Sequence, residues 1–236
     1  MLTLVLLPGM DGTGELFSEF VAALPPSCAT VIVRYPTEES LSYQELEGIV
    51  RAACPVSELF ILVAESFSTP LAIKYAATHP ANLAGMVLCA GFAASPVRGW
   101  RRLLVSLFAP LLLRVPLPNI ALRFWLIGPD ASASLLVAVR GAISSIQPRV
   151  LAARLRSVLK CDARADLNNI EVPILYLQAN GDRLIDAPCL ETIQWIKPDV
   201  KIVSIDGPHL LLQRQPRMAA EAVANFARSC CPSAMS

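Results

Sequence analysis

The sequence predicts an α/β fold in which about six mostly parallel strands form a sheet flanked by helices, with an inserted helical cap. Short apolar, β-branched runs alternate with longer helical stretches, a pattern typical of a parallel sheet covered on both faces. One long interval lacks any strand pattern. A length of 236 residues is sufficient for one such domain with a small insertion.

The expected elements follow one another along the chain. Strands are expected at 2–7, 30–34, 59–64, 85–89, 172–177 and 201–205. Helical patterns cover 16–24, 42–54, 67–78, 187–196 and 217–228. Residues 95–169 show helical pattern interrupted by prolines, so we expect a cap there and a core formed by 1–94 and 170–236.

Composition disfavours several classes of protein. A net charge of +1 argues against nucleic acid as the main partner. The most apolar stretch, 103–113, contains Pro110 and is shorter than the roughly 20 residues of a membrane span, so no transmembrane segment is expected. Seven cysteines without a C-x-x-C pair and two histidines disfavour a disulfide framework and a zinc site. No secretory signal is visible, and we therefore expect a cytoplasmic protein.

A serine stands where a strand pattern gives way to a helix, in Ala-Glu-Ser-Phe-Ser at 64–68. A nucleophile elbow makes such a sharp turn, and it needs small residues two before and two after the nucleophile. Ala64 and Ser68 meet that need around Ser66, whereas centring the turn on Ser68 would place Pro70 at a small-residue position. The alternative is that Ser66 only caps the following helix.

A glycine-rich loop, Leu-Pro-Gly-Met-Asp-Gly-Thr-Gly at 7–14, directly follows the first expected strand. Its backbone N–H groups could stabilise an oxyanion, with the N–H of Phe67 as a second donor. A phosphate-binding loop is the alternative. The glycines, however, are spaced G-x-x-G-x-G, no G-K-[ST] follows, and the next strand ends in Arg34-Tyr35 without an acidic residue for a ribose.

The two histidines differ in their expected positions. His79 ends the helix that Ser66 starts, about 20 Å from the serine at 1.5 Å per residue. His209 follows the last expected strand and so lies at the same sheet edge as Ser66. Asp182, after the preceding strand, is the first choice for the acid, and Asp186 is the alternative.

These residues resemble the α/β-hydrolase family. The resemblance rests on four segments: Leu-Pro-Gly-Met-Asp-Gly-Thr-Gly at 7–14, Ala-Glu-Ser-Phe-Ser at 64–68, Asn-Gly-Asp-Arg-Leu-Ile at 180–185 and Gly-Pro-His-Leu-Leu-Leu-Gln-Arg-Gln-Pro at 207–216. It implies a catalytic triad of Ser66, Asp182 and His209, with the backbone N–H groups of Met10 and Phe67 as the oxyanion hole. It also implies a serine esterase that forms an acyl-enzyme from a small-molecule acyl ester and requires no cofactor and no metal.

The sequence departs from the family pattern at three points. Pro8-Gly9 stands where many members have His-Gly, and Ala64 and Ser68 replace the two elbow glycines. The sequence begins at the strand that the family numbers third, so six parallel strands are expected.

The expected cap is strongly basic and apolar. Residues 95–165 hold eleven Lys and Arg against two Asp and Glu, about +9, and include Trp100, Arg154 and Arg156. These arginines could face an anionic substrate or an acidic acyl carrier protein, as in the bacterial methyl esterases for carrier-linked pimeloyl esters that the small cap resembles. They could instead solvate a hydrophobic lid or favour loose membrane association.

Several functions stay open at this point. They are a methyl esterase or thioesterase for carrier-linked acyl groups, an acyltransferase resembling plant phytyl-ester-forming relatives, and a hydrolase-fold binding protein without activity.

Overall fold

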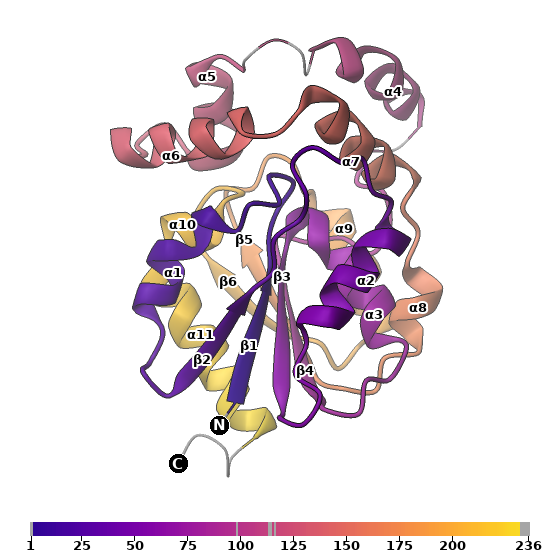
Figure 1. The fold of residues 1–236 in the computed structure, drawn as a ribbon, viewed down its shortest axis with the longest axis vertical. Helices are drawn as coiled ribbons and strands as arrows, with labels where there is room; N and C mark the ends of the chain where they lie inside the picture. The colour runs from indigo at the N-terminus through magenta and orange to yellow at the C-terminus, as the bar shows by residue number, and fades with distance from the viewer. Residues whose placement is uncertain (1, 98, 113–114, 116, 232–236) are drawn as a thin grey trace.

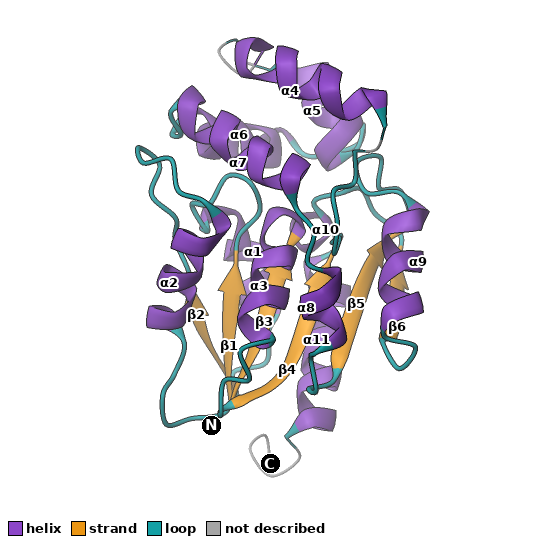
Figure 2. Cartoon of the chain, turned by 90° about the vertical axis from the view of Figure 1, so that its right-hand side faces the viewer, coloured by secondary structure: helices purple, strands orange, loops and turns teal. Residues whose placement is uncertain are grey.

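Six parallel strands form one sheet in the order β2-β1-β3-β4-β5-β6 in the computed structural model, which describes residues 2–97, 99–112, 115 and 117–231. The strands are β1 (Leu2–Leu7), β2 (Cys28–Ile32), β3 (Phe60–Glu65), β4 (Leu83–Cys89), β5 (Ile174–Ala179) and β6 (Lys201–Ile205). Helices cover both faces of the sheet, and further helices lie across the end to which the strands point (Figures 1 and 2). The predicted fold class is confirmed.

Each face of the sheet has its own helical layer. One layer holds α2 (Tyr43–Ala53), α3 (Thr69–Ala76), α8 (Arg164–Asn168) and α9 (Ala187–Ile196). The other holds α1 (Ser18–Ala23), α10 (Leu211–Arg214) and α11 (Pro216–Cys230). A capping box between Ser42 and Glu45 starts α2, and prolines at the first positions start α9 and α11.

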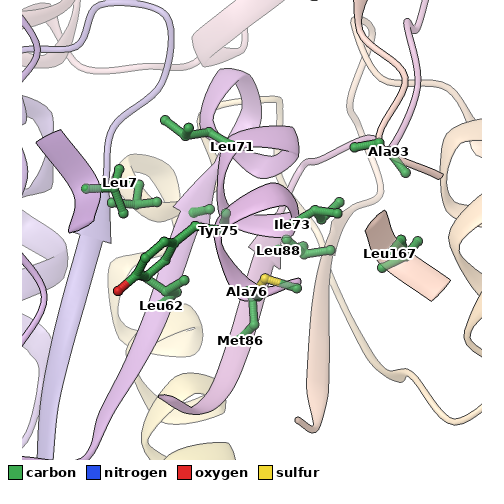
Figure 3. Close-up of a cluster of buried hydrophobic side chains, with 14 of the residues drawn as sticks. Leu7, Leu62, Leu71, Ile73, Tyr75, Ala76, Met86, Leu88, Ala93 and Leu167 are labelled. Atoms are coloured by element: carbon green, nitrogen blue, oxygen red, sulfur yellow. The ribbon is translucent and has the colours of Figure 1, made fainter. Parts of the chain in front are cut away.

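Apolar strand residues alternate between these two layers and are buried on both sides. Figure 3 shows the layer in which Leu7, Leu62 and Leu88 of the strands meet Leu71 and Ile73 of α3, all fully buried. Burial of one such side chain contributes about 1.5–3 kcal/mol, so the sheet is a rigid base for the loops at its edge.

Two strands are shifted by two residues from their expected positions. β2 ends at Ile32, and the chain leaves the sheet soon after it: the N–H of Val33 still donates to the carbonyl of Leu6 in β1 at 2.9 Å, whereas the N–H of Tyr35 donates to the carbonyl of Gly12 at 2.8 Å. β5 starts at Ile174 because Pro173 has no N–H for the ladder, although its carbonyl accepts from Met86 at 3.0 Å.

The described part of the segment between β4 and β5 consists of helices joined by loops and adds no strand to the sheet. It contains α4 (Trp100–Leu112), α5 (Asn119–Leu122), the π-helix η3 (Arg123–Ile127), α6 (Ala133–Ser144), α7 (Pro148–Lys160) and α8. Figure 1 places α4 to α7 over the end of the sheet, whereas α8 contacts α3 and α9 beside it. We keep the division into a core and a cap, 95–169, as a proposal; residues 98, 113, 114 and 116 of that cap lie outside the described residues.

None of the described helices is by itself both long enough and apolar enough to span a membrane. The pair α6 and α7 meets both requirements together but is bent by 94° at its break.

Candidate active site

Ser66 lies at a strained corner directly after β3. Its backbone φ is 47°, in the left-handed region that non-glycine residues rarely adopt, at a cost of about 1–3 kcal/mol. The chain turns there into the 3-10 helix η2 (Ser66–Ser68) and then α3. Ala64 and Ser68, the small flanking residues, are fully buried while Ser66 is half-buried. This is the geometry of a nucleophile elbow, and strain at such a site is a sign of function.

His209 lies in the loop after β6 and contacts Ser66 directly. Its Nε2 is 2.8 Å from the Oγ of Ser66, and its ring is almost fully buried. The neighbouring Leu210 donates its N–H to the carbonyl of Leu126 in η3, at 3.0 Å. The helical segment above the sheet therefore helps to fix the loop that carries His209.

Asp182 completes the chain of hydrogen bonds. Its Oδ2 lies 2.7 Å from Nδ1 of His209, and both side chains are about 5% exposed or less. Its Oδ1 accepts the backbone N–H groups of Leu184 and Ile185, at 2.8 and 3.0 Å. With both oxygens occupied by donors, the carboxylate is held in one orientation and favours the His209 tautomer that leaves Nε2 free to accept a proton.

Gly181 allows the loops of Asp182 and His209 to approach each other. The N–H of Gly181 donates to the carbonyl of Gly207 at 2.9 Å, and a Cβ on Gly181 would lie 3.0 Å from that carbonyl oxygen. The Asn-Gly-Asp segment thus packs closely against the backbone of the Asp-Gly-Pro-His segment because its middle residue has no side chain. A side chain at position 181 would press against the loop that carries His209.

The alternative residues lie elsewhere. His79 follows α3 at the other end of that helix, is half-exposed, and faces Glu171 at 3.9 Å. Asp186 is the N-cap residue of α9, and its Oδ1 accepts a hydrogen bond from the Sγ–H of Cys189 at 3.2 Å. The structure thus brings together the first-choice residues Ser66, Asp182 and His209 and leaves His79 and Asp186 outside.

The two expected oxyanion donors, Met10 and Phe67, come from loops that contact each other. The Oγ of Ser68 donates to the carbonyl of Pro8 and lies 2.7 Å from the hydroxyl of Tyr35, so the loop after β1 is tied to the elbow. Phe67 is buried, and its carbonyl accepts the hydroxyl of Tyr43 at 2.8 Å. Serine therefore replaces the second elbow glycine with a hydroxyl that joins the two loops. The donor roles of Met10 and Phe67 stay predictions.

Glu65 is a buried carboxyl that the sequence analysis did not single out. It precedes Ser66, is 1% exposed, and accepts the side-chain amide of Gln213 at 3.3 Å. Burial, reinforced by the charge of Asp11, raises its pKa to about 8, so it is largely protonated at neutral pH. Within the described residues, Oε1 of Glu65 and Oε1 of Gln213 have no hydrogen-bond partner, and protonation turns one acceptor oxygen of Glu65 into a donor.

Arg154 corrects the expectation of a cationic rim. It lies on α7 but is only 2% exposed, and its guanidinium binds backbone carbonyls of the loop after β1, whereas Arg156 on the same helix is exposed. A helical pattern shows which residues share a face, and it does not show which face docks. Arg154 is therefore unavailable to an external partner.

The described residues contain no group of three or more His, Cys, Asp and Glu side chains arranged to hold a metal ion. The chemistry available at this edge of the sheet is that of a serine hydroxyl next to a buried, oriented imidazole. Such a pair can transfer the serine proton to histidine while the oxygen attacks an electrophilic carbonyl.

Comparison with known proteins agrees with this arrangement. Residues 4–222 match the model of a family described as the alpha/beta hydrolase family. No curated protein matches the sequence significantly.

Solved structures share the fold at low sequence identity. An esterase from Thermogutta terrifontis with malate bound is 17% identical with a TM-score of 0.84, over 100% of this chain and 91% of that one. A bromoperoxidase from Bacillus anthracis is 14% identical with a TM-score of 0.81, over 96% and 91%. MenH from S. aureus is 15% identical with a TM-score of 0.76, over 96% and 93%. These similarities establish the fold.

Proposed function

The chain belongs to the alpha/beta hydrolase family, and on that basis we propose that it is a serine esterase that hydrolyses carboxylic esters. The observation that carries the proposal is the hydrogen-bonded chain from Ser66 through His209 to Asp182, at 2.8 and 2.7 Å. A serine hydroxyl becomes nucleophilic when a histidine takes its proton and a carboxylate orients that histidine.

In the first half-reaction Ser66 Oγ attacks the ester carbonyl and its proton passes to Nε2 of His209. The negative oxygen accepts hydrogen bonds from the N–H groups of Met10 and Phe67. The tetrahedral species then collapses, the bond to the leaving alcohol breaks, and His209 protonates that alcohol. Water attacks the acyl-Ser66 in the same manner, releasing the acid and returning the proton to Ser66.

We place the acyl group of the substrate against an apolar cavity of about 590 Å³ among α5, α6 and α7. Ile143, Ile146 and Leu151 line this cavity. Met10, one of the proposed oxyanion residues, packs against the cluster that contains Ile146 and Leu151. An apolar wall beside the oxyanion loop favours an apolar acyl chain over a polar one.

Labelling with a fluorophosphonate probe tests the nucleophile. The probe's phosphorus forms a bond to Ser66 Oγ, fluoride leaves, and His209 takes the serine proton. We expect wild-type protein to be labelled and folded Ser66→Ala protein to remain unlabelled. Absence of label on folded wild type would contradict the proposal and favour the inactive binding protein.

A panel of p-nitrophenyl esters from acetyl to palmitoyl tests the acyl cavity. We expect Ile143→Trp, which fills part of the cavity, to lower kcat/KM for long acyl chains and to leave the acetyl ester unaffected. Equal effects on all chain lengths would place the acyl group elsewhere. Adding a long-chain alcohol and measuring ester synthesis against hydrolysis distinguishes an acyltransferase.

An ester linked to an acidic acyl carrier protein is the second candidate substrate, favoured by exposed arginines at 102, 140, 149 and 156. Reversing two of them, with Arg102→Glu and Arg156→Glu, should weaken activity on a carrier-linked ester and spare p-nitrophenyl acetate. If the double variant hydrolyses the carrier-linked ester as fast as the wild type does, an acidic carrier protein is excluded as the partner. The cytoplasm remains the proposed location, supported by unbridged thiols such as Cys54 and Cys89.

A further inference from the structure

Arg154 is a buried cation bound to the loop that carries Met10. Its Nη1 donates to the carbonyls of Met10 and Asp11, at 2.9 and 2.7 Å, and its Nη2 donates to the carbonyl of Pro36 at 2.8 Å. Its guanidinium carbon lies 5.8 Å from the centre of the Tyr35 ring. Burying a guanidinium is costly unless its donors are satisfied, and here three backbone carbonyls accept from them.

The loop that Arg154 contacts is a β-turn. The N–H of Gly12 donates to the carbonyl of Gly9 at 3.1 Å, so Met10 and Asp11 are the two central residues, and Arg154 binds the carbonyls of both. In a trans peptide the N–H and C=O point in opposite directions. Because the Gly9 carbonyl is directed into the turn, the N–H of Met10 is directed out of it, and Arg154 prevents the turn from rotating.

The turn is shaped to receive the guanidinium. Gly12 has a φ of +70°, and a Cβ at this position would lie 2.6 Å from Nη1 of Arg154. On its other side the turn is joined to the elbow through the hydrogen bond from Ser68 to Pro8. It is therefore held from α7 by Arg154 and from the elbow by Ser68.

We propose that Arg154 is a positioning residue for ester hydrolysis, which fixes the Met10 N–H as an oxyanion donor. Because Arg154 lies on α7, the orientation of that N–H depends on the position in which α7 is docked. This inference rests on the proposed function. Arg154 touches neither the substrate nor the reacting atoms and acts through the backbone of Met10. An α7 that moves away would take the guanidinium with it and release the turn.

Arg154→Met tests the inference, with Lys160→Met as the control, since Lys160 is an exposed cation at the end of the same helix. For p-nitrophenyl butyrate we expect Arg154→Met to lower kcat about 10- to 100-fold, while KM changes less than about threefold, because an oxyanion donor acts mainly in the transition state. The affinity for an aryl boronic acid, which forms a tetrahedral adduct with Ser66, should fall by a similar factor. Lys160→Met should match the wild type in kcat, in KM and in its affinity for the boronic acid.

Two further variants keep the test decisive if Arg154→Met does not fold. Arg154→Lys retains the charge but cannot span the three carbonyls, and we expect about a tenfold lower kcat. Arg154→Ala should regain kcat when methylguanidinium is added at millimolar concentration and should not respond to methylammonium. A kcat in Arg154→Lys equal to that of the wild type, or an absence of guanidinium rescue, would overturn the inference.

Fluorophosphonate labelling of the wild type distinguishes a failure of the positioning role from a failure of the esterase proposal. A wild type that is labelled and turns over ester, alongside Arg154 variants of unchanged kcat, overturns the positioning role alone. A folded wild type that is not labelled overturns the esterase proposal and this inference with it.

Discussion

The sheet core and α4 of the helical segment treat their apolar residues in opposite ways. In the core, strand residues such as Leu62 and Leu88 are completely buried. In α4, Trp100 is 70% exposed and Leu103 and Leu107 are each 63% exposed, and their spacing places them on one face of the helix. Because burial of apolar surface stabilises a fold, we expect the core to contribute more to stability than α4 does.

The residues of the candidate active site are also divided between the sheet core and the helical segment. Ser66, Asp182 and His209 stand on loops at the carboxyl ends of β3, β5 and β6. The helical segment reaches this edge through Leu126, which binds the loop of His209, and through Arg154, which binds the loop of Met10. The core carries the proposed triad, and the helical segment forms hydrogen bonds with two loops at the same edge.

The largest expected effect is on the triad. Asp182→Asn should lower kcat for p-nitrophenyl butyrate about 10,000-fold, about 5.5 kcal/mol in the barrier, because an amide favours the wrong tautomer of His209. The backbone donors of Leu184 and Ile185 can still bind the amide oxygen, so the fold should persist. Asp186→Asn, the matched control, should stay within about threefold of the wild type. If kcat falls by a similar factor in Asp182→Asn and in Asp186→Asn, Asp182 does not have the role that we propose for it.

The next effect tests the packing of the core. Leu62→Ala should lower the free energy of unfolding by about 2–5 kcal/mol, since Leu62 is fully buried and its truncation leaves a cavity. Urea unfolding measured at neutral pH gives the difference. The control Leu62→Met, which nearly conserves volume, should lose less than about 1.5 kcal/mol. A small loss in Leu62→Ala would mean that the sheet is not the main source of stability.

Glu65 gives an effect that depends on pH and that is smaller than that of Leu62→Ala over any single pH unit. Its pKa is raised to about 8 in the folded state, so the native state holds a proton that the unfolded state releases near its usual pKa. Stability from this group is present at low pH and falls as pH rises, by about 1.4 kcal/mol for each pH unit up to about pH 8. The free energy of unfolding, measured with urea at several values from pH 5 to 8, should fall less steeply with pH in Glu65→Gln than in the wild type. The two slopes should differ by about 1.4 kcal/mol per pH unit. Parallel slopes for the two proteins would show that Glu65 is already ionised in the fold.

The smallest expected effect belongs to the outer helix. Leu107→Ala should change the free energy of unfolding by less than about 0.5 kcal/mol, because most of the side chain already faces water. Urea unfolding compared directly with Leu62→Ala gives the sharpest contrast between the two regions. A loss above about 2 kcal/mol in Leu107→Ala would show that α4 packs against something in solution.

Local pattern alone was sufficient for the fold class and for the choice of candidate site residues. In a parallel sheet the carboxyl ends of all strands meet at one edge, so the chain order of Ser66, Asp182 and His209 was enough to predict that they lie together. β2 ended two residues earlier than expected, where the chain turns to the Gly12 loop, and β5 started two residues later because the missing N–H of Pro173 overrides strand propensity.

By itself the sequence determined which segments are strands and helices, because apolar periodicity and turn residues are local properties. Only the tertiary structure decided which charges are buried. The sequence left Arg154 either facing an anionic partner or solvating the lid, whereas its guanidinium lies under α7 on three backbone carbonyls. Glu65 is largely protonated next to the proposed nucleophile. Burial of a charged group depends on which face of a helix docks and on which distant loops supply hydrogen-bond partners, and residues more than a hundred positions apart set both.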